Sequence, residues 1–274
     1  MAKIIVDSSC EFNKNITNLD VSTVPFKITM DDVTYIDDDN LDMQKFYEDM
    51  RNSDCRILTS CPSPDDFLKH MEGDEIFIIT ITSQLSGSYN SAEVAKKMYL
   101  EKNPNANVHI FDSKSASAGE TGILKYITDL INDNFSFYDI VNTVEGWIDK
   151  TLTIFALNSF TNLARNGRIP KFAGTISKFL SMKAIARNKD GKISLLSIER
   201  GAKKAINQLV EKAVKLCDKT LDTPIIISEA NDENSAIYVK DLLSKNFPDR
   251  IIEITKMRAL SSTYAEEGGI IIFI

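Results

Sequence analysis

The stretch IFIITITSQLSGSYNSAE, residues 76–93, places a continuous apolar run directly before a loop rich in small hydroxyl side chains. The run from Ile76 to Ile81 lacks the alternation of a half-exposed strand, so it predicts a strand that helices cover on both faces. The residues from Ser91 to Asn103 repeat apolar side chains at helical spacing and predict a helix. In open α/β sheets, ligands lie beyond the carboxyl ends of such strands, which is where these hydroxyls fall.

The same alternation of strand and helix extends outward along the chain. Apolar runs predict strands at Lys3–Val6, Ser22–Ile28, Glu75–Ile81, Asn107–Phe111, Leu152–Leu157, Lys192–Ile198, Pro224–Ser228, Ile251–Lys256 and Gly269–Phe273. Helical spacing predicts helices at Asp42–Asn52, Ser91–Asn103, Ala118–Asn132, Phe137–Lys150, Ala202–Lys219 and Asn234–Asn246. We expect an α/β fold with largely parallel or mixed sheets, made of two α/β domains at residues 1–151 and 152–274.

Composition argues against several function classes. The 274-residue chain is 43% hydrophobic and 26% charged, as in ordinary soluble proteins, and its net charge is −7. Nucleic acid is not expected as a partner, because binding phosphates needs a concentrated basic surface. The first residues, MAKIIVDSSCEF, hold too short an apolar run for a signal peptide or a membrane span, so we expect a cytoplasmic protein without stable membrane insertion.

The metal-binding side chains predict no metal site. The cysteines are Cys10, Cys55, Cys61 and Cys217, and the histidines are His70 and His109. The cysteines form no CxxC motif and have no histidine at metal-ligand spacing, so they are interpreted as reduced thiols. Cys61 differs from the others because it lies inside a hydroxyl-rich segment. The acidic run Asp37–Asn40 lacks the spacing of a calcium loop and is interpreted as a solvated turn.

Three hydroxyl-rich segments each follow a predicted strand: LTSCPSP (58–64), TSQLSGSYNSAE (82–93) and DSKSASAGETG (112–122). In the first, Thr59 and Ser60 follow a short strand at Arg56–Leu58, and Ser63 with Pro64 is typical of a helix N-cap and first turn. Backbone N–H groups at a helix start are unpaired and can hold an anion. The first two segments therefore predict the two sides of a carboxylate or phosphate site.

The second segment gathers several serines around Gly87, which permits close approach of a ligand. They are Ser83, Ser86, Ser88 and Ser91. Ser86 or Ser88 is expected to cap the helix, and since four serines exceed what one cap requires, at least one of the four is expected to contact a ligand. A serine nucleophile is disfavoured, because His70 and His109 are interpreted as structural or solvent-exposed and no GxSxG motif is present.

Two basic segments lie in the second half of the chain. LARNGRIPKFAG (163–174) holds Arg165, Arg168 and Lys171 around Gly167, and IERGAKKA (198–205) holds Arg200, Lys203 and Lys204. Each is either a solvated face or a docking surface for an anionic ligand or a partner.

The order of these motifs resembles the DegV family of bacterial fatty-acid-binding proteins. The resemblance rests on VDSSCE, LTSCPSP, SQLSGSYNSAE, FDSKSASAGETG, LARNGRI, DGKISLLSIERG and a strand ending in Ser228 and Glu229, spread over nearly the whole chain. It implies a two-domain protein that encloses one fatty acid between its domains, with the carboxyl group held by strand-end hydroxyls. It further implies a carrier, not an enzyme, without a cofactor, which presents the acyl chain to a separate fatty acid kinase that makes an acyl phosphate for phospholipid metabolism.

The resemblance also implies roles for single residues. Thr59, Ser60 and Ser91 match the carboxylate-binding hydroxyls, with Ser86 and Gly87 beside them. Arg168 and Arg200 match basic positions tied to presentation to the kinase.

Two positions depart from the family pattern. The family usually has Gln where this chain has Cys61, and a histidine segment, His-x-Gly-Pro-Gly, where this chain has SSTYAEEGG (261–269). Ser262 or a neighbour would then replace the histidine that helps to hold the carboxyl group. This departure bears on coupling to the kinase more than on lipid binding. The alternatives are an enzyme or sensor for a small phosphorylated or carboxylated metabolite, and a lipid-binding member without kinase coupling.

Overall fold

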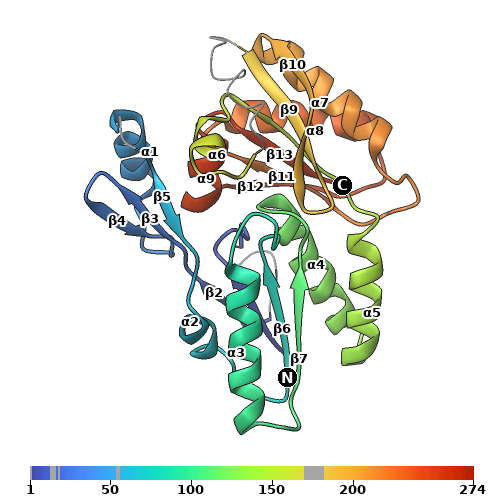
Figure 1. Ribbon diagram of the computed structural model, residues 1–274. Coiled ribbons are helices and arrows are strands. Elements are labelled where there is room, and N and C mark those ends of the chain that lie inside the picture. The colour runs from blue at the N-terminus through green and yellow to red at the C-terminus, as the bar shows by residue number, and fades with distance from the viewer. Residues whose placement is uncertain (1, 13–16, 18, 54–55, 170–181) are drawn as a thin grey trace.

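The computed structural model describes residues 2–12, 17, 19–53, 56–169 and 182–274, which form an α/β fold with three sheets (Figure 1). One sheet is wholly parallel, with strand order β2-β1-β6-β7. Its strands are β1 (Lys3–Asp7), β2 (Val21–Val24), β6 (Glu75–Thr80) and β7 (Asn107–Asp112). The predicted α/β class with parallel and mixed sheets is confirmed.

The largest sheet is mixed and has the order β10-β9-β8-β13-β11-β12. Its strands are β8 (Thr153–Leu157), β9 (Met182–Lys189), β10 (Lys192–Arg200), β11 (Ile225–Glu229), β12 (Ile252–Lys256) and β13 (Ile270–Phe273). Only β11 and β12 pair in parallel, and the other neighbours are antiparallel. Among the described strands, those before residue 152 and those after it belong to different sheets. The division into domains at that point stays a prediction.

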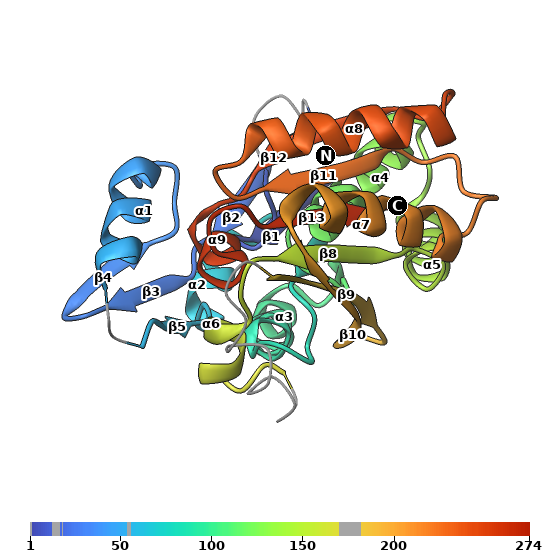
Figure 2. The ribbon, with the colours of Figure 1, turned by 90° about the horizontal axis from the view of Figure 1, so that it is seen from above.

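A small antiparallel sheet projects from one side of the molecule together with helix α1 (Met43–Asn52) (Figures 1 and 2). Its order is β4-β3-β5, with β3 (Lys27–Met30), β4 (Val33–Ile36) and β5 (Leu58–Ser60). The prediction of one strand at Ser22–Ile28 is wrong, because Pro25 lies between β2 and β3, which enter different sheets. Proline cannot donate the N–H bond that a continuous strand would need there.

Helices cover both faces of the parallel sheet, as its apolar strands predict. Helix α3 (Ser88–Lys102) packs Ala92 and Ala95 on one face, beside the short α2 (Pro64–Leu68). Helices α4 (Ala118–Asn132) and α5 (Phe137–Ile148) pack on the other face. Residues of α4 also share a core with Ile226 and Phe273 of the mixed sheet, so α4 lies between the two large sheets.

The opposite face of the mixed sheet packs against α7 (Ala202–Leu216) and α8 (Glu233–Asn246), which Figure 2 shows from above. Two short helices were not predicted, α6 (Thr161–Arg165) and α9 (Ala259–Ala265). Helix α9 lies between the projecting sheet and the rest of the protein, where it contacts α1 and β3. Its position brings residues from the end of the chain to the cavity described next.

Candidate functional site

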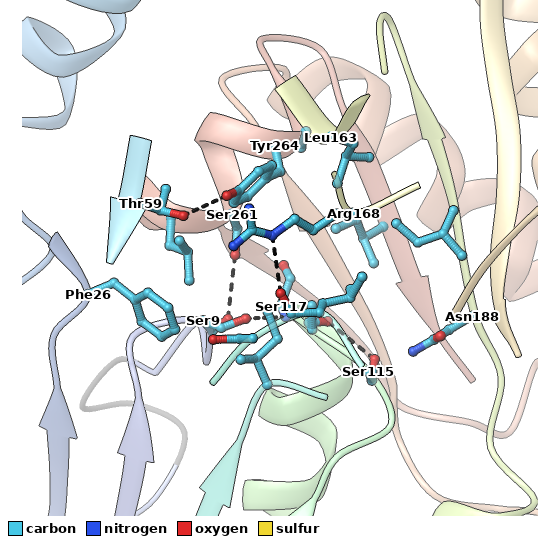
Figure 3. Close-up of a pocket in the computed structure, with 18 of the residues that line it drawn as sticks. Ser9, Phe26, Thr59, Ser115, Ser117, Leu163, Arg168, Asn188, Ser261 and Tyr264 are labelled. Atoms are coloured by element: carbon cyan, nitrogen blue, oxygen red, sulfur yellow. Dashed lines mark hydrogen bonds between the residues drawn. The ribbon is translucent and has the colours of Figure 1, made fainter. Parts of the chain in front are cut away.

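A cavity of ≈ 320 Å³ lies beyond the carboxyl ends of β1, β6 and β7, against the inner face of the mixed sheet (Figure 3). This volume is within the usual range for small-molecule sites. Much of the lining is apolar: Phe26, Ile81, Leu85, Phe155, Leu157, Leu163, Ile193, Leu260 and Ile271. The polar lining is mostly hydroxyl: Ser9, Thr59, Ser60, Ser86, Ser115, Ser117, Thr153, Ser261 and Tyr264, with Arg168 and Asn188.

Two long helices begin at this cavity without a side-chain cap. Helix α3 begins after Gly87 and α4 begins after Ser117, and both of these residues line the cavity. Free N–H groups and the helix dipole make each start attractive to an anion. The prediction that Ser86 or Ser88 is the N-cap is wrong, because Gly87 occupies that position. Ser86 Oγ instead accepts from the N–H of Ser88 at 3.2 Å.

Asp7 holds the loops at the strand ends together beneath the cavity. Its carboxylate accepts from the N–H groups of Ser9 and Ile81 at 3.0 Å each, and from Ser88 Oγ at 2.6 Å. Burial raises the pKa of Asp7, although these donors act in the opposite direction. Asp7 thereby fixes the ends of β1 and β6 and the start of α3, so the loops that line the cavity are positioned by the sheet.

Thr59 and Ser60 line the cavity, but not as residues after a parallel strand. They lie within β5, which pairs antiparallel to β3, so the prediction of a strand at Arg56–Leu58 followed by these hydroxyls is wrong. Thr59 Oγ1 is 2.6 Å from Tyr264 Oη (Figure 3). The expected helix cap at Ser63 is confirmed, with a reciprocal bond to Asp66 and Pro64 in the first turn.

Tyr264 is a cavity residue that the sequence did not single out, although it lies in the segment that replaces the family's histidine. On α9, Ser261 and Tyr264 are three residues apart and share the face that lines the cavity. Ser262 points elsewhere, because its Oγ is 2.7 Å from Tyr47 Oη and it is fully buried. The cavity is thus lined by neighbours of Ser262 and not by Ser262 itself.

Of the other predicted site residues, Arg168 lines the cavity, whereas Ser91 and Arg200 do not. Ser91 lies one turn into α3, where its N–H bonds to the carbonyl of Gly87, and it does not line the cavity. Arg168 lines the cavity and donates from Nε to the carbonyl of Leu85 at 3.2 Å. Arg200 ends β10, is exposed and lies outside the cavity lining. Lys171 is outside the described residues.

The third hydroxyl segment forms the floor of the cavity. Ser115 Oγ is 2.6 Å from Thr153 Oγ1 on β8, which joins the floor to the mixed sheet. Ser117 has a φ of 56°, which is rare for a residue with a side chain. Its N–H donates to Ser9 Oγ at 3.2 Å, and its Oγ is 2.7 Å from Glu11 Oε1.

Glu11 is a second residue that the sequence did not single out. It is 2% exposed, and its other carboxylate oxygen accepts from the N–H of Arg258 at 2.6 Å. Burial raises the pKa of Glu11 to about 8. A carboxyl group that titrates near neutral pH therefore lies directly behind a hydroxyl of the cavity floor.

The acidic run at Asp37–Asn40 is not wholly a solvated turn, so that interpretation is wrong for Asp37. Asp37 is 1% exposed and accepts from the N–H groups of Ala259 and Leu260 at 2.9 and 3.0 Å. It therefore caps α9 from the end of β4. Burial raises the pKa of Asp37, and the nearby Arg258 guanidinium lowers it.

The histidines and cysteines supply no reactive pair at the cavity. His70 lies in a turn after α2. His109 lies in β7, and its Nε2 is 2.9 Å from Oε1 of Glu145 on α5. Neither histidine lines the cavity. Cys61 lines it, Cys10 and Cys217 are buried, and Cys55 is outside the described residues. Across the part of the chain that the structure describes, no three His, Cys, Asp or Glu side chains are placed to hold a metal ion. Within that same part, no helix is both long and apolar enough to cross a membrane.

Comparisons with known proteins agree on one family. A protein-family model described as "Uncharacterised protein, DegV family" matches residues 1–274. A DegV domain-containing protein of Streptococcus pneumoniae (strain ATCC BAA-255 / R6) is 34% identical over 274 residues, covering 98% of this chain and 97% of the relative.

Two solved structures have closely similar folds. The Streptococcus pneumoniae fatty acid kinase (Fak) B3 protein loaded with linoleic acid is 33% identical, with a TM-score of 0.93 and coverage of 100% of this chain and 98% of that chain. A DegV family protein of Ruminococcus gnavus ATCC 29149 with vaccenic acid is 30% identical, with a TM-score of 0.92 and coverage of 100% and 99%.

Proposed function

The chain belongs to the DegV family, and from this premise we propose that it binds one long-chain fatty acid in the cavity beyond β1, β6 and β7. The proposal rests on the lining of the cavity. Part of the lining is apolar, and the rest carries hydroxyl groups beside two helix starts without a side-chain cap. Burying an acyl chain of ~16 methylenes at about 0.8 kcal/mol each gives roughly 13 kcal/mol of gross stabilisation, which favours full enclosure. The similar proteins loaded with linoleic and vaccenic acid support this ligand class.

The carboxyl group is assigned to the side of the cavity where Thr59 and Tyr264 meet. Ser60, Ser86 and Gly87 line the same cavity, and Gly87 begins α3, whose free N–H groups favour negative charge. Neutral donors and a helix start suit a carboxylate because they supply hydrogen bonds without a fixed salt bridge. Ser91 and Ser262, which the sequence also suggested, do not line the cavity, so the carboxyl group is assigned without them.

The acyl chain is assigned to the apolar side chains of the mixed sheet. Phe155 and Leu157 on β8 and Ile271 on β13 lie on the sheet face that lines the cavity, and Ile193 of β10 extends this lining. The ligand would then be enclosed between residues 1–151 and 152–274, as the predicted domains imply.

We assign the protein the role of a carrier that presents its acyl chain to a separate fatty acid kinase. The absence of a serine–histidine pair among the described lining residues gives the cavity no acyl-transfer machinery of its own. One similar protein is named as a fatty acid kinase B protein, which supports kinase coupling. Arg168 at the cavity and Arg200 at the end of β10 are the proposed contacts to that partner.

The test is to identify what the purified protein carries. Protein from bacterial cells is denatured and extracted with organic solvent, and the lipids are identified by mass spectrometry against a mock purification. About one fatty acid per chain is expected. A preparation that yields no lipid, even after incubation with a fatty-acid mixture, would refute lipid binding and favour a site for a small carboxylated or phosphorylated metabolite.

A further inference from the structure

Ser117 joins the cavity to a buried carboxyl group. It lines the cavity floor, and its Oγ is 2.7 Å from Oε1 of Glu11, which is 2% exposed. The other oxygen of Glu11 accepts from the backbone N–H of Arg258 at 2.6 Å. Both oxygens of Glu11 are therefore engaged, and the hydroxyls of Ser117 and Ser261, which both line the cavity, link it to the cavity.

The charge of Glu11 decides which way the Ser117 hydroxyl can act. A serine hydroxyl has one hydrogen to donate and lone pairs to accept with. If Glu11 is ionised, Ser117 donates this hydrogen to Glu11 and turns lone pairs toward the cavity. If Glu11 is protonated, it donates to Ser117 Oγ, and the Ser117 hydrogen is free to point into the cavity. A carboxylate in the cavity meets a donor from Ser117 only in the second case.

The charged groups around Glu11 favour its neutral form. Asp7 on β1, Glu120 on α4 and Asp37 after β4 are all buried acids, and none offers a positive charge. The nearby cation is Arg258 at the start of α9. Its guanidinium is engaged elsewhere, by Asp39 Oδ1 at 2.9 Å and the carbonyl of Asp37 at 3.1 Å.

We propose that Glu11 is a positioning residue whose protonation strengthens the binding of a carboxylate by the cavity, because only then does Ser117 donate to the ligand. This inference rests on the proposed binding of fatty acids. Burial that raises the pKa of Glu11 to about 8 places the change within an accessible range of pH. Affinity for a fatty acid anion is constant below that range and falls above it, by up to tenfold for each pH unit.

The experiment compares a charged and an uncharged ligand of equal length. Equilibrium dialysis of delipidated full-length protein measures the Kd of radiolabelled laurate and of 1-dodecanol from pH 6.5 to 9.5. Laurate is ionised throughout this range, so its own titration does not contribute. For the unaltered protein, the Kd of laurate is expected to rise about fivefold between pH 8 and 9 for a pKa of about 8, whereas the Kd of dodecanol stays constant.

Three variants separate the role of Glu11 from a general effect of alkaline pH. Glu11→Gln keeps the shape without a titrating group and is expected to bind laurate with a Kd that does not change with pH. Ser117→Ala removes one of the two hydroxyl links and is expected to weaken the same pH dependence. Glu229→Gln is the matched control, a buried acid at the end of β11 with no bond to Ser117 or Glu11 among the described contacts, and it is expected to retain the dependence.

The outcomes distinguish the two proposals. If neither laurate nor dodecanol binds, the proposed function fails. If both bind but the Kd of laurate is constant up to pH 9.5, or rises equally in Glu11→Gln, the role of Glu11 is refuted. If Glu11→Gln does not fold, titration calorimetry of the unaltered protein replaces it. The heat of ligand binding at pH 8.5 in two buffers of different ionisation enthalpy gives the number of protons taken up. Uptake of a proton with laurate but not with dodecanol supports the proposal, and no uptake overturns it.

Discussion

The pair of hydroxyls at Thr59 and Tyr264 provides the sharpest test of where the ligand's carboxyl group lies. The two oxygens are 2.6 Å apart, so one hydroxyl donates to the other and one hydrogen stays free to donate into the cavity. Tyr264→Phe keeps the ring that lines the cavity and removes only the oxygen. Thr59→Val likewise keeps the shape of the side chain.

The expected effect follows from the charge of the acceptor. A hydrogen bond to a charged group contributes about 1.5–3 kcal/mol, and one between neutral groups about 0.5–1.5 kcal/mol. Loss of one hydroxyl leaves the other to donate to the ligand without the partner that orients it, so either single change should weaken laurate binding by at most roughly tenfold, or about 1.4 kcal/mol. The double variant should lose up to about 3 kcal/mol, and the loss for dodecanol should be smaller by about 1 kcal/mol.

The assay is equilibrium dialysis of both ligands at pH 7, with thermal unfolding to show that each variant is folded. Ser262→Ala is the matched control on the same helix, because Ser262 contacts Tyr47 and does not line the cavity. It should change the Kd of laurate less than about twofold. If the folded double variant binds laurate as tightly as the unaltered protein, or loses dodecanol equally, the assignment of the carboxyl group to this pair is wrong.

Three further predictions concern stability. Asp37→Asn weakens the buried cap of α9 and should lower the free energy of unfolding in urea by about 1–3 kcal/mol, whereas an unchanged value would contradict the cap. Gly122→Ala places a Cβ 2.2 Å from the Phe273 ring and should cost about 1–3 kcal/mol by urea unfolding, whereas Gly146→Ala on α5 has open space and should be neutral or stabilising. Because the pKa of Glu11 rises from 4.5 to about 8 on folding, the folded state holds its proton more tightly, so the contribution of this group to stability is complete below pH 4.5 and is lost as pH rises to about 8. Urea unfolding at pH 6 and 8.5 should show a smaller fall for Glu11→Gln than for the unaltered protein, and equal falls would refute this.

The parts of the fold that the sequence predicts are those with strong local signals. The strands β1, β6, β7, β11 and β12 and the helices α3, α4, α7 and α8 carry clear apolar patterns, and their predicted bounds agree with the structure to within a few residues. The sequence did not predict most of the projecting sheet. Its strand β4 is only the four residues VTYI between acidic residues, and the turn that leads into it has Asp31 at a φ of 50°. Short strands on a small sheet have too few apolar positions to set a period.

The cavity was predicted where local chemistry marks it and missed where it depends on distant contacts. Hydroxyl loops after strands are visible as motifs, and the segments at 82–93 and 112–122 both contribute lining residues. Tyr264 lies 205 residues from Thr59, and Glu11 lies 106 residues from Ser117, so neither pairing has a local signal. Only the docking of α9 against the projecting sheet brings Tyr264 to the cavity.

Replacement of the family's histidine segment changes how this cavity should respond to pH. A histidine near a ligand would titrate close to pH 6.5, and its charge would alter binding there. In this chain the corresponding segment supplies Ser261 and Tyr264, whose hydroxyls donate while uncharged, and neither histidine lines the described part of the cavity. Glu11 is an acid bonded to a hydroxyl of the floor, and burial places its transition at a higher pH. The pH dependence of binding should therefore lie on the alkaline side, and a transition near pH 6.5 that survives Glu11→Gln would show that another group holds the carboxylate.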